Sequence, residues 1–198
     1  VGFHAILKKY VIHTHSVYAN VLTCSEEGES LAEKLFKNKD YGFIFLPYIN
    51  PGFELTLAMK NAINDYIVKT GKYPEVIFMK NHGLVVCSDY IDRVKAVNTD
   101  VNETIRLYFG LADDFHEVIL RENNGGFISE TKVVCDFVAK NKLDKNYLDK
   151  YPLYPDQLVC LNNILAFSPD TLTINDGEVR YNCGIKQATT LEETLAAY

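Results

Sequence analysis

Three histidines stand at positions where they could share one metal ion. His13 and His15 are separated by a single residue in the apolar run 11–15, VIHTH. Because side chains alternate between the two faces of a β-strand, this spacing places both imidazoles on the same face. His82 follows a second apolar run, residues 76–79, and stands in an Asn-His-Gly turn. Three imidazoles occupy three corners of a tetrahedral zinc site and leave the fourth for water or substrate, as in catalytic metal sites.

Other roles for these histidines have to be weighed against a metal site. A single histidine at the end of a strand is more often a hydrogen-bonded core residue than a ligand. The occurrence of all three histidines after apolar strands favours a metal site. Neither strand needs a histidine for packing, and Gly83 lets the backbone turn the His82 imidazole toward the other histidines. A cupin would have a carboxylate shortly after the His-x-His pair, and a metallo-β-lactamase an Asp-His dipeptide. Residues 16–20, SVYAN, contain neither.

Composition excludes several classes of protein. The 198 residues suffice for one domain with a full hydrophobic core, and 47% hydrophobic with 23% charged residues is typical of a soluble protein. The net charge of −6 argues against a nucleic-acid partner, which requires a basic face. No apolar run approaches the roughly 18 residues of a membrane span, so we expect no membrane partner. Five cysteines without a Cys-x-x-Cys motif suit reduced thiols in a cytoplasmic protein.

The elements that must position the histidines alternate between strands and helices. We expect strands over 11–14, 41–46, 75–79 and 84–87, and helices over 16–23, 26–36, 51–69 and 89–109. This alternation predicts an α/β domain with helices packed on a sheet. Further along, residues 172–182 indicate a hairpin, and a capping box at 190–193 predicts the start of a last helix. We expect one domain over 1–198, with 123–198 as an elaboration of it.

The residues around the histidines resemble the class II aldolase/adducin family. The resemblance rests on residues 12–19, IHTHSVYA, and on residues 81–85, NHGLV, whose separation is also of the expected size. It covers about residues 1–110 and points to zinc sugar-phosphate aldolases such as fuculose-phosphate and rhamnulose-phosphate aldolase. Residues 154–159, YPDQLV, resemble the predicted-aldolase branch, akin to the aldolase half of rhamnulose-phosphate aldolase/dehydrogenase fusions.

The resemblance carries expectations for fold, cofactor and activity. It implies a three-layer αβα sandwich around a mixed β-sheet, with His13, His15 and His82 as ligands of Zn²⁺ or another divalent transition metal. It also implies a lyase of carbohydrate metabolism that cleaves a phosphorylated ketose by retro-aldol chemistry through a metal-stabilised enediolate. Asn81 could orient a ligand from the second layer around the metal, although a plain turn role explains it equally well. The family's tetramers imply a homo-oligomer.

One part of the family pattern falls outside this sequence. In these aldolases a catalytic Glu precedes a helical histidine by four residues. His4 matches that histidine, so the expected Glu falls directly ahead of Val1. We therefore expect the N-terminal part of the domain to be missing, and no catalytic acid or base is assigned within the chain. Two alternatives stay open: epimerase, dehydratase or decarboxylase chemistry on a sugar phosphate, and a non-enzymatic interaction module of the adducin type.

Overall fold

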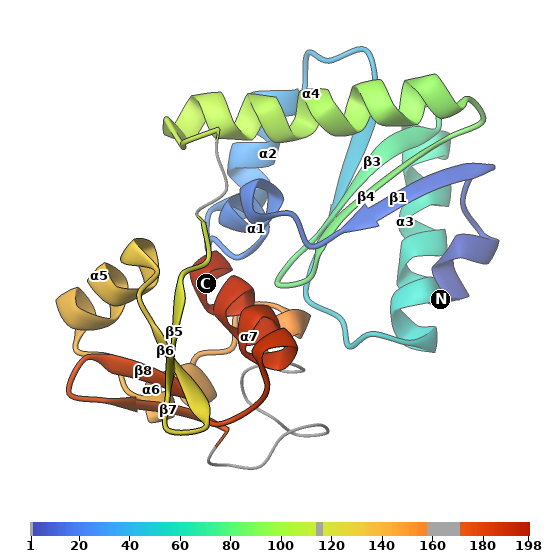
Figure 1. The fold of residues 1–198 in the computed structure, drawn as a ribbon. Helices are drawn as coiled ribbons and strands as arrows, with labels where there is room; N and C mark the ends of the chain where they lie inside the picture. Colours follow the sequence, from blue (N-terminus) through green and yellow to red (C-terminus); the bar gives the residue numbers. More distant parts are fainter. Residues whose placement is uncertain (1, 114–116, 158–170) are drawn as a thin grey trace. The chain divides into compact units, whose positions relative to one another are not determined.

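A computed structural model describes residues 2–113, 117–157 and 171–198 of the chain. The chain divides into two compact units, residues 1–113 and 114–198, and each has its own sheet and its own hydrophobic core (Figure 1). The expectation of a single elaborated domain stays a prediction. Among the described helices, none combines the length and the apolar character that crossing a membrane requires.

The first unit is a three-layer sandwich of helices around a four-stranded mixed sheet (Figure 1). Its elements in chain order are η1 (Gly2–Ala5), β1 (Tyr10–Thr14), α1 (Val17–Thr23), α2 (Gly28–Phe36), β2 (Gly42–Leu46), α3 (Phe53–Thr70), β3 (Pro74–Met79), β4 (Gly83–Ser88) and α4 (Ile91–Phe109). The strand order is β1-β4-β3-β2, in which β2 runs parallel to β3 and the other neighbours pair antiparallel. The predicted αβα sandwich around a mixed sheet is confirmed for this unit.

Alternating apolar side chains build a core on each face of this sheet. Phe78 and Val86 belong to the core beneath α1, α2 and α4, whereas Ile77 and Val85 belong to the core beneath η1 and α3. Because β3 and β4 are covered on both faces, their sequences are nearly continuous apolar runs. All five residues of β1 are only partly buried. The strand that carries His13 therefore leaves part of its surface accessible.

Among its described residues, the second unit packs α-helices with an antiparallel sheet of order β5-β6-β8-β7. Its elements are β5 (Leu120–Asn123), β6 (Gly126–Ser129), α5 (Lys132–Asn141), α6 (Lys145–Lys150), β7 (Leu172–Asn175), β8 (Glu178–Tyr181) and α7 (Ile185–Ala197). The predicted hairpin is confirmed as β7 and β8. The predicted helix start at 190–193 is wrong, because α7 already begins at Ile185 and the Thr190 hydroxyl donates to the Lys186 carbonyl oxygen within the helix.

Candidate metal centre

Strand β1 and the residue after it supply two of the histidines. The register of the β1–β4 pair places His13 opposite Val85 and Thr14 opposite Leu84. His15 follows the last residue of the strand, at the point where the chain turns into α1. The His-x-His spacing thus spans the end of the strand and delivers both imidazoles to the same end of the sheet.

The tight turn between β3 and β4 supplies the third histidine. Asn81 adopts a left-handed backbone conformation with φ of 52°, which asparagine tolerates better than most residues. Gly83 has φ of 147°, and a Cβ atom there would lie 2.5 Å from the Thr14 carbonyl oxygen. Only glycine fits this close approach of the turn to β1. The turn therefore brings His82 beside the end of β1.

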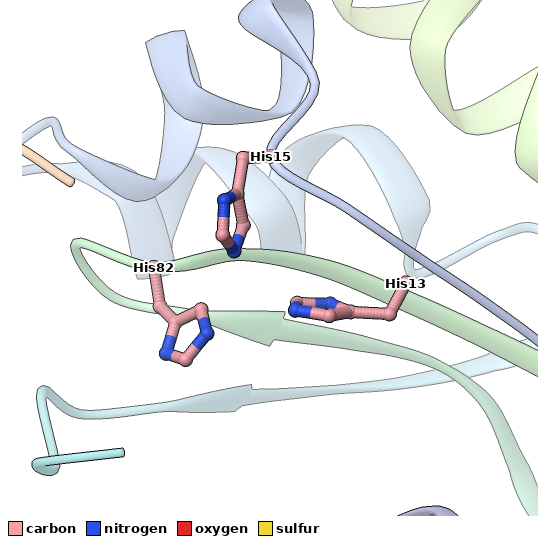
Figure 2. Close-up of side chains that lie close together, drawn as sticks. All are labelled: His13, His15 and His82. Carbon is pink, nitrogen blue, oxygen red and sulfur yellow. The ribbon is translucent and has the colours of Figure 1, made fainter. Parts of the chain in front are cut away.

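The three imidazoles converge on one point. One ring nitrogen from each of His13, His15 and His82 lies within 4.8 Å of the other two (Figure 2). The ring centres are 5.0 Å apart for His13 and His15, 5.3 Å for His13 and His82, and 5.2 Å for His15 and His82. The rings thus form a nearly equilateral triangle, and this group could hold a metal ion. Within the described residues, the cluster consists of histidines alone.

Hydrogen bonding and packing fix the His13 ring. Its Nδ1 lies 3.0 Å from the Leu84 carbonyl oxygen. A carbonyl oxygen only accepts hydrogen bonds, so Nδ1 carries the proton and Nε2 carries the lone pair. Phe3 packs edge-on against the same ring, with 5.3 Å between ring centres. His82 is 7% exposed, whereas His13 and His15 are only partly buried.

Two thiols of the first unit have raised pKa values. Burial raises the pKa of Cys24, at the C-terminal end of α1, to about 11, although a hydrogen bond involving Thr23 opposes the shift. Burial also raises the pKa of the Cys87 thiol on β4. Neither thiol belongs to the cluster of ring nitrogens among the described residues.

The other histidines and Asn81 have less direct relations to the centre. His4 is exposed on η1 and stacks on Phe3, with 4.7 Å between ring centres. His116 lies outside the described residues. The backbone N–H of Asn81 donates to the Thr23 carbonyl oxygen at 3.0 Å, so its backbone holds the turn. A role for the Asn81 side chain beside the metal stays a prediction.

Sequence reasoning missed two buried polar residues next to the centre. Asn20 is 7% exposed and Thr23 is fully buried, both on α1. Their signal in the sequence is an i, i+3 pair of polar residues within a helix whose Ala19 and Leu22 are also fully buried. Both residues bond to the segments that carry His15 and His82.

Comparison with known families identifies the part of the chain that carries these histidines. The sequence matches the family model described as class II aldolase and adducin N-terminal domain over residues 4–109, which is more than half of the chain. The chain belongs to the class II aldolase/adducin family. The match includes the strand, the turn and all three histidines of the centre. The family resemblance and the expected fold class are thereby confirmed.

Individual relatives cover only part of the chain. The uncharacterised oxidoreductase YuxG of Bacillus subtilis (strain 168) is 27% identical over 116 residues, which are 58% of this chain and 16% of that protein. The N-terminal class II aldolase domain of a Thermoplasma acidophilum protein has a TM-score of 0.44 at 24% identity, over 55% of this chain and 46% of that one. For YgbL of Klebsiella pneumoniae the TM-score is 0.38 at 18% identity, over 58% and 55%.

Proposed function

We propose that His13, His15 and His82 bind one divalent metal ion, preferentially Zn²⁺. This ion would form the catalytic centre of a class II aldolase-type lyase. The observation that carries this proposal is the convergence of the three ring nitrogens within 4.8 Å. Family membership supports the same assignment. The proposed reaction is the retro-aldol cleavage of a phosphorylated ketose.

The geometry of the rings fits a tetrahedral ion. With a Zn–N distance of about 2.1 Å, ring centres lie about 3.2 Å from the ion and therefore about 5.3 Å from each other. The three ring-centre distances here are 5.0, 5.3 and 5.2 Å. Around such an ion the coordinating nitrogens would be about 3.4 Å apart. The corresponding nitrogens now lie up to 4.8 Å apart, so small ring rotations suffice to bring them to the coordinating distance.

The chain's residues hold and shield the proposed ion. The Leu84 carbonyl fixes the His13 tautomer, so that Nε2 is the nitrogen presented to the metal. His82 is buried, whereas the partly buried His13 and His15 would leave substrate an approach to the ion. A bound Zn²⁺ would supply Lewis-acid stabilisation of the negative charge that develops on the substrate as the carbon–carbon bond breaks.

Metal analysis tests this proposal directly. We expect one zinc per chain in the purified full-length protein and loss of that zinc in His82→Ala. His4→Ala is the matched control, because His4 is exposed and is not part of the cluster. A wild-type protein without stoichiometric divalent metal, or a His82→Ala variant that still binds it tightly, would overturn the metal assignment. Absence of stoichiometric metal from the wild-type protein, with His82→Ala changing nothing, would favour an adducin-like interaction module.

Product analysis separates the possible reactions. The zinc-loaded protein is incubated with a panel of ketose, aldose and sugar-acid phosphates, and the products are identified by mass spectrometry and NMR. Retro-aldol cleavage yields two shorter carbonyl compounds. An epimerised sugar, a dehydrated sugar or released CO₂ would instead assign the epimerase, dehydratase or decarboxylase alternative. Because all four reactions require stabilisation of negative charge next to a carbonyl group, the three histidines serve each of them.

The proposal extends to assembly and location. Resemblance to the family supports a homo-tetramer and a cytoplasmic enzyme. Light scattering of the purified full-length protein checks the assembly, and a monomer at micromolar concentration would contradict it. Fractionation of cells checks the location.

A further inference from the structure

Two polar side chains are buried beside the metal centre within an otherwise apolar helix face. Thr23 is fully buried and Asn20 is 7% exposed, while their neighbours Ala19 and Leu22 belong to the main core. Burying a hydroxyl or an amide costs free energy unless hydrogen bonds compensate it. The partners of these two side chains therefore indicate why polar groups are placed here.

Three hydrogen bonds, joined through the covalent bonds of Thr23 and Asn20, link the two ligand-bearing segments. Asn20 Nδ2 donates to the His15 carbonyl oxygen at 3.4 Å. Thr23 Oγ1 donates to Asn20 Oδ1 at 3.3 Å. The Asn81 backbone N–H donates to the Thr23 carbonyl oxygen at 3.0 Å. One end of the chain is a metal-ligand candidate itself, and the other end is the residue before His82.

We propose that Asn20 and Thr23 are positioning residues that set the separation of His15 and His82 for metal binding. This inference rests on the proposed metal site. Neither side chain belongs to the cluster of ring nitrogens, so both act through the backbone of the ligand-bearing segments. Helix α1 provides the rigid support, since it also packs on β3 and β4.

The physical reason is the strict geometry of metal coordination. Metal–ligand distances tolerate changes of only about 0.2 Å, so a turn that moves freely would bind the ion weakly. Residues that orient ligands without touching the metal commonly change metal affinity 10–100-fold when they are removed. A link between the β1 end and the β3–β4 turn keeps the two imidazoles in place before the ion arrives.

Isosteric variants test the proposal. Thr23→Val removes the Oγ1 donor but keeps the shape and the backbone carbonyl, and Asn20→Leu removes the amide at similar volume. We expect each to weaken the zinc affinity of the full-length protein about tenfold, measured by competition with a chromophoric chelator. Thr23→Ser keeps the hydroxyl and should retain the wild-type affinity. The double variant should lose little more than either single variant, because the two side chains act as one unit.

A matched control and a wild-type measurement complete the test. Thr194→Val removes a largely buried threonine hydroxyl from α7 and should leave zinc affinity unchanged. In the wild-type protein, zinc should slow hydrogen exchange of the Asn81 amide, a measurement that requires no variant.

The outcomes distinguish this inference from the proposed function. Wild-type protein that binds no zinc overturns both. If the wild-type protein binds zinc and the zinc affinity of Thr23→Val is within twofold of the wild-type value, the positioning role alone is overturned, whatever the melting temperature of the variant. If the variants fail to fold, unchanged exchange of the Asn81 amide on zinc binding overturns it. A tenfold loss with rescue in Thr23→Ser supports it.

Discussion

His13 Nδ1 donates its proton to the carbonyl oxygen of Leu84, 3.0 Å away on the neighbouring strand. This bond joins β1 to β4 at the point where the metal-ligand candidates meet. It orients the ring, and it leaves Nε2 as the nitrogen with the lone pair. Histidine ligands in metalloproteins commonly donate their second ring nitrogen to a carbonyl or a carboxylate in this way.

The first prediction concerns this tautomer. In zinc-loaded protein with ¹⁵N-labelled histidine, long-range ¹H–¹⁵N spectra should show His13 with a protonated Nδ1 and a metal-shifted Nε2. The exposed His4 should show no zinc-dependent shift and serves as an internal reference. Coordination through Nδ1 of His13 would mean that the bond to Leu84 is broken in the metal-bound state.

The second prediction concerns Gly83. Gly83→Ala places a Cβ 2.5 Å from the Thr14 carbonyl oxygen, at a residue whose φ is 147°. Strained backbone alone costs about 1–3 kcal/mol, so with the added clash we expect a larger loss in the free energy of unfolding. The turn should shift away from β1 and weaken zinc binding. Urea unfolding and chelator competition measure the two effects.

Gly71→Ala is the control for the glycine substitution. Gly71 also has positive φ, 70°, but no atom lies within 4 Å of the position that its added methyl group would take. This variant should lose about 1–2 kcal/mol from backbone strain and keep the wild-type zinc affinity. Equal zinc affinities in the two variants would show that the approach of the turn to β1 is not needed for the site.

Two local features of the site were predictable from the sequence. Strand periodicity places His13 and His15 together, and the Asn-His-Gly sequence predicts a turn that puts His82 at the end of a hairpin. Strand order was not predictable in the same way. The sequence shows that β3 and β4 are buried strands, but long-range pairing decides that β4, and not β3, lies beside β1. That pairing is what brings Gly83 against Thr14.

Tertiary contacts also overrode two local signals. Asn20 and Thr23 look like ordinary polar residues in a short helix, and only the fold shows that they bond to the His15 and His82 segments. Residues 190–193 match a capping box, yet they lie inside α7, where the buried Glu192 bonds to side chains of β6 and β8. Asn81, which bonds to Thr23, and Ser129, which bonds to Glu192, lie far away from them in the sequence, where periodicity and capping rules carry no information.

The third prediction is a pH dependence of stability through Asp100. Partial burial opposes ionisation of Asp100, but hydrogen bonds from Lys39 at 2.8 Å and Tyr41 at 2.6 Å outweigh it and hold its pKa below the usual value. The carboxylate therefore contributes stability at pH values above the unfolded pKa, about 3.9, and loses it as the pH falls through the lower folded pKa.

Asp100→Asn tests this dependence. The variant should be less stable than wild type at neutral pH, and the difference should shrink to nothing once the pH is below the folded pKa of Asp100. The effect should be modest, because the side chain is 45% exposed and solvent screens its ion pair. Asp65 is an exposed carboxylate on α3. Asp65→Asn should show no such pH dependence of stability when urea unfolding midpoints are measured across the pH range. A constant difference at every pH would contradict the assignment.

The fourth prediction concerns a buried carboxylate in the second unit. Glu192 is fully buried, and its two oxygens accept hydrogen bonds from Ser129, at 2.5 Å, and from Tyr181. Burial and the neighbouring Glu192 raise the pKa of Tyr181, so its hydroxyl keeps the proton that it donates. The carboxylate thus ties α7 to β6 and β8.

Glu192→Gln removes one of the two acceptors while preserving shape. The amide nitrogen can only donate, so one hydroxyl must give up its bond, and we expect a loss of about 1–3 kcal/mol in unfolding free energy. Glu193→Gln makes the same chemical change on the exposed neighbour and should stay within about 0.5 kcal/mol of wild type. Hydrogen exchange should quicken in β6, β8 and α7 of Glu192→Gln. If both variants unfold at the same urea concentration, the buried carboxylate does not hold this unit together.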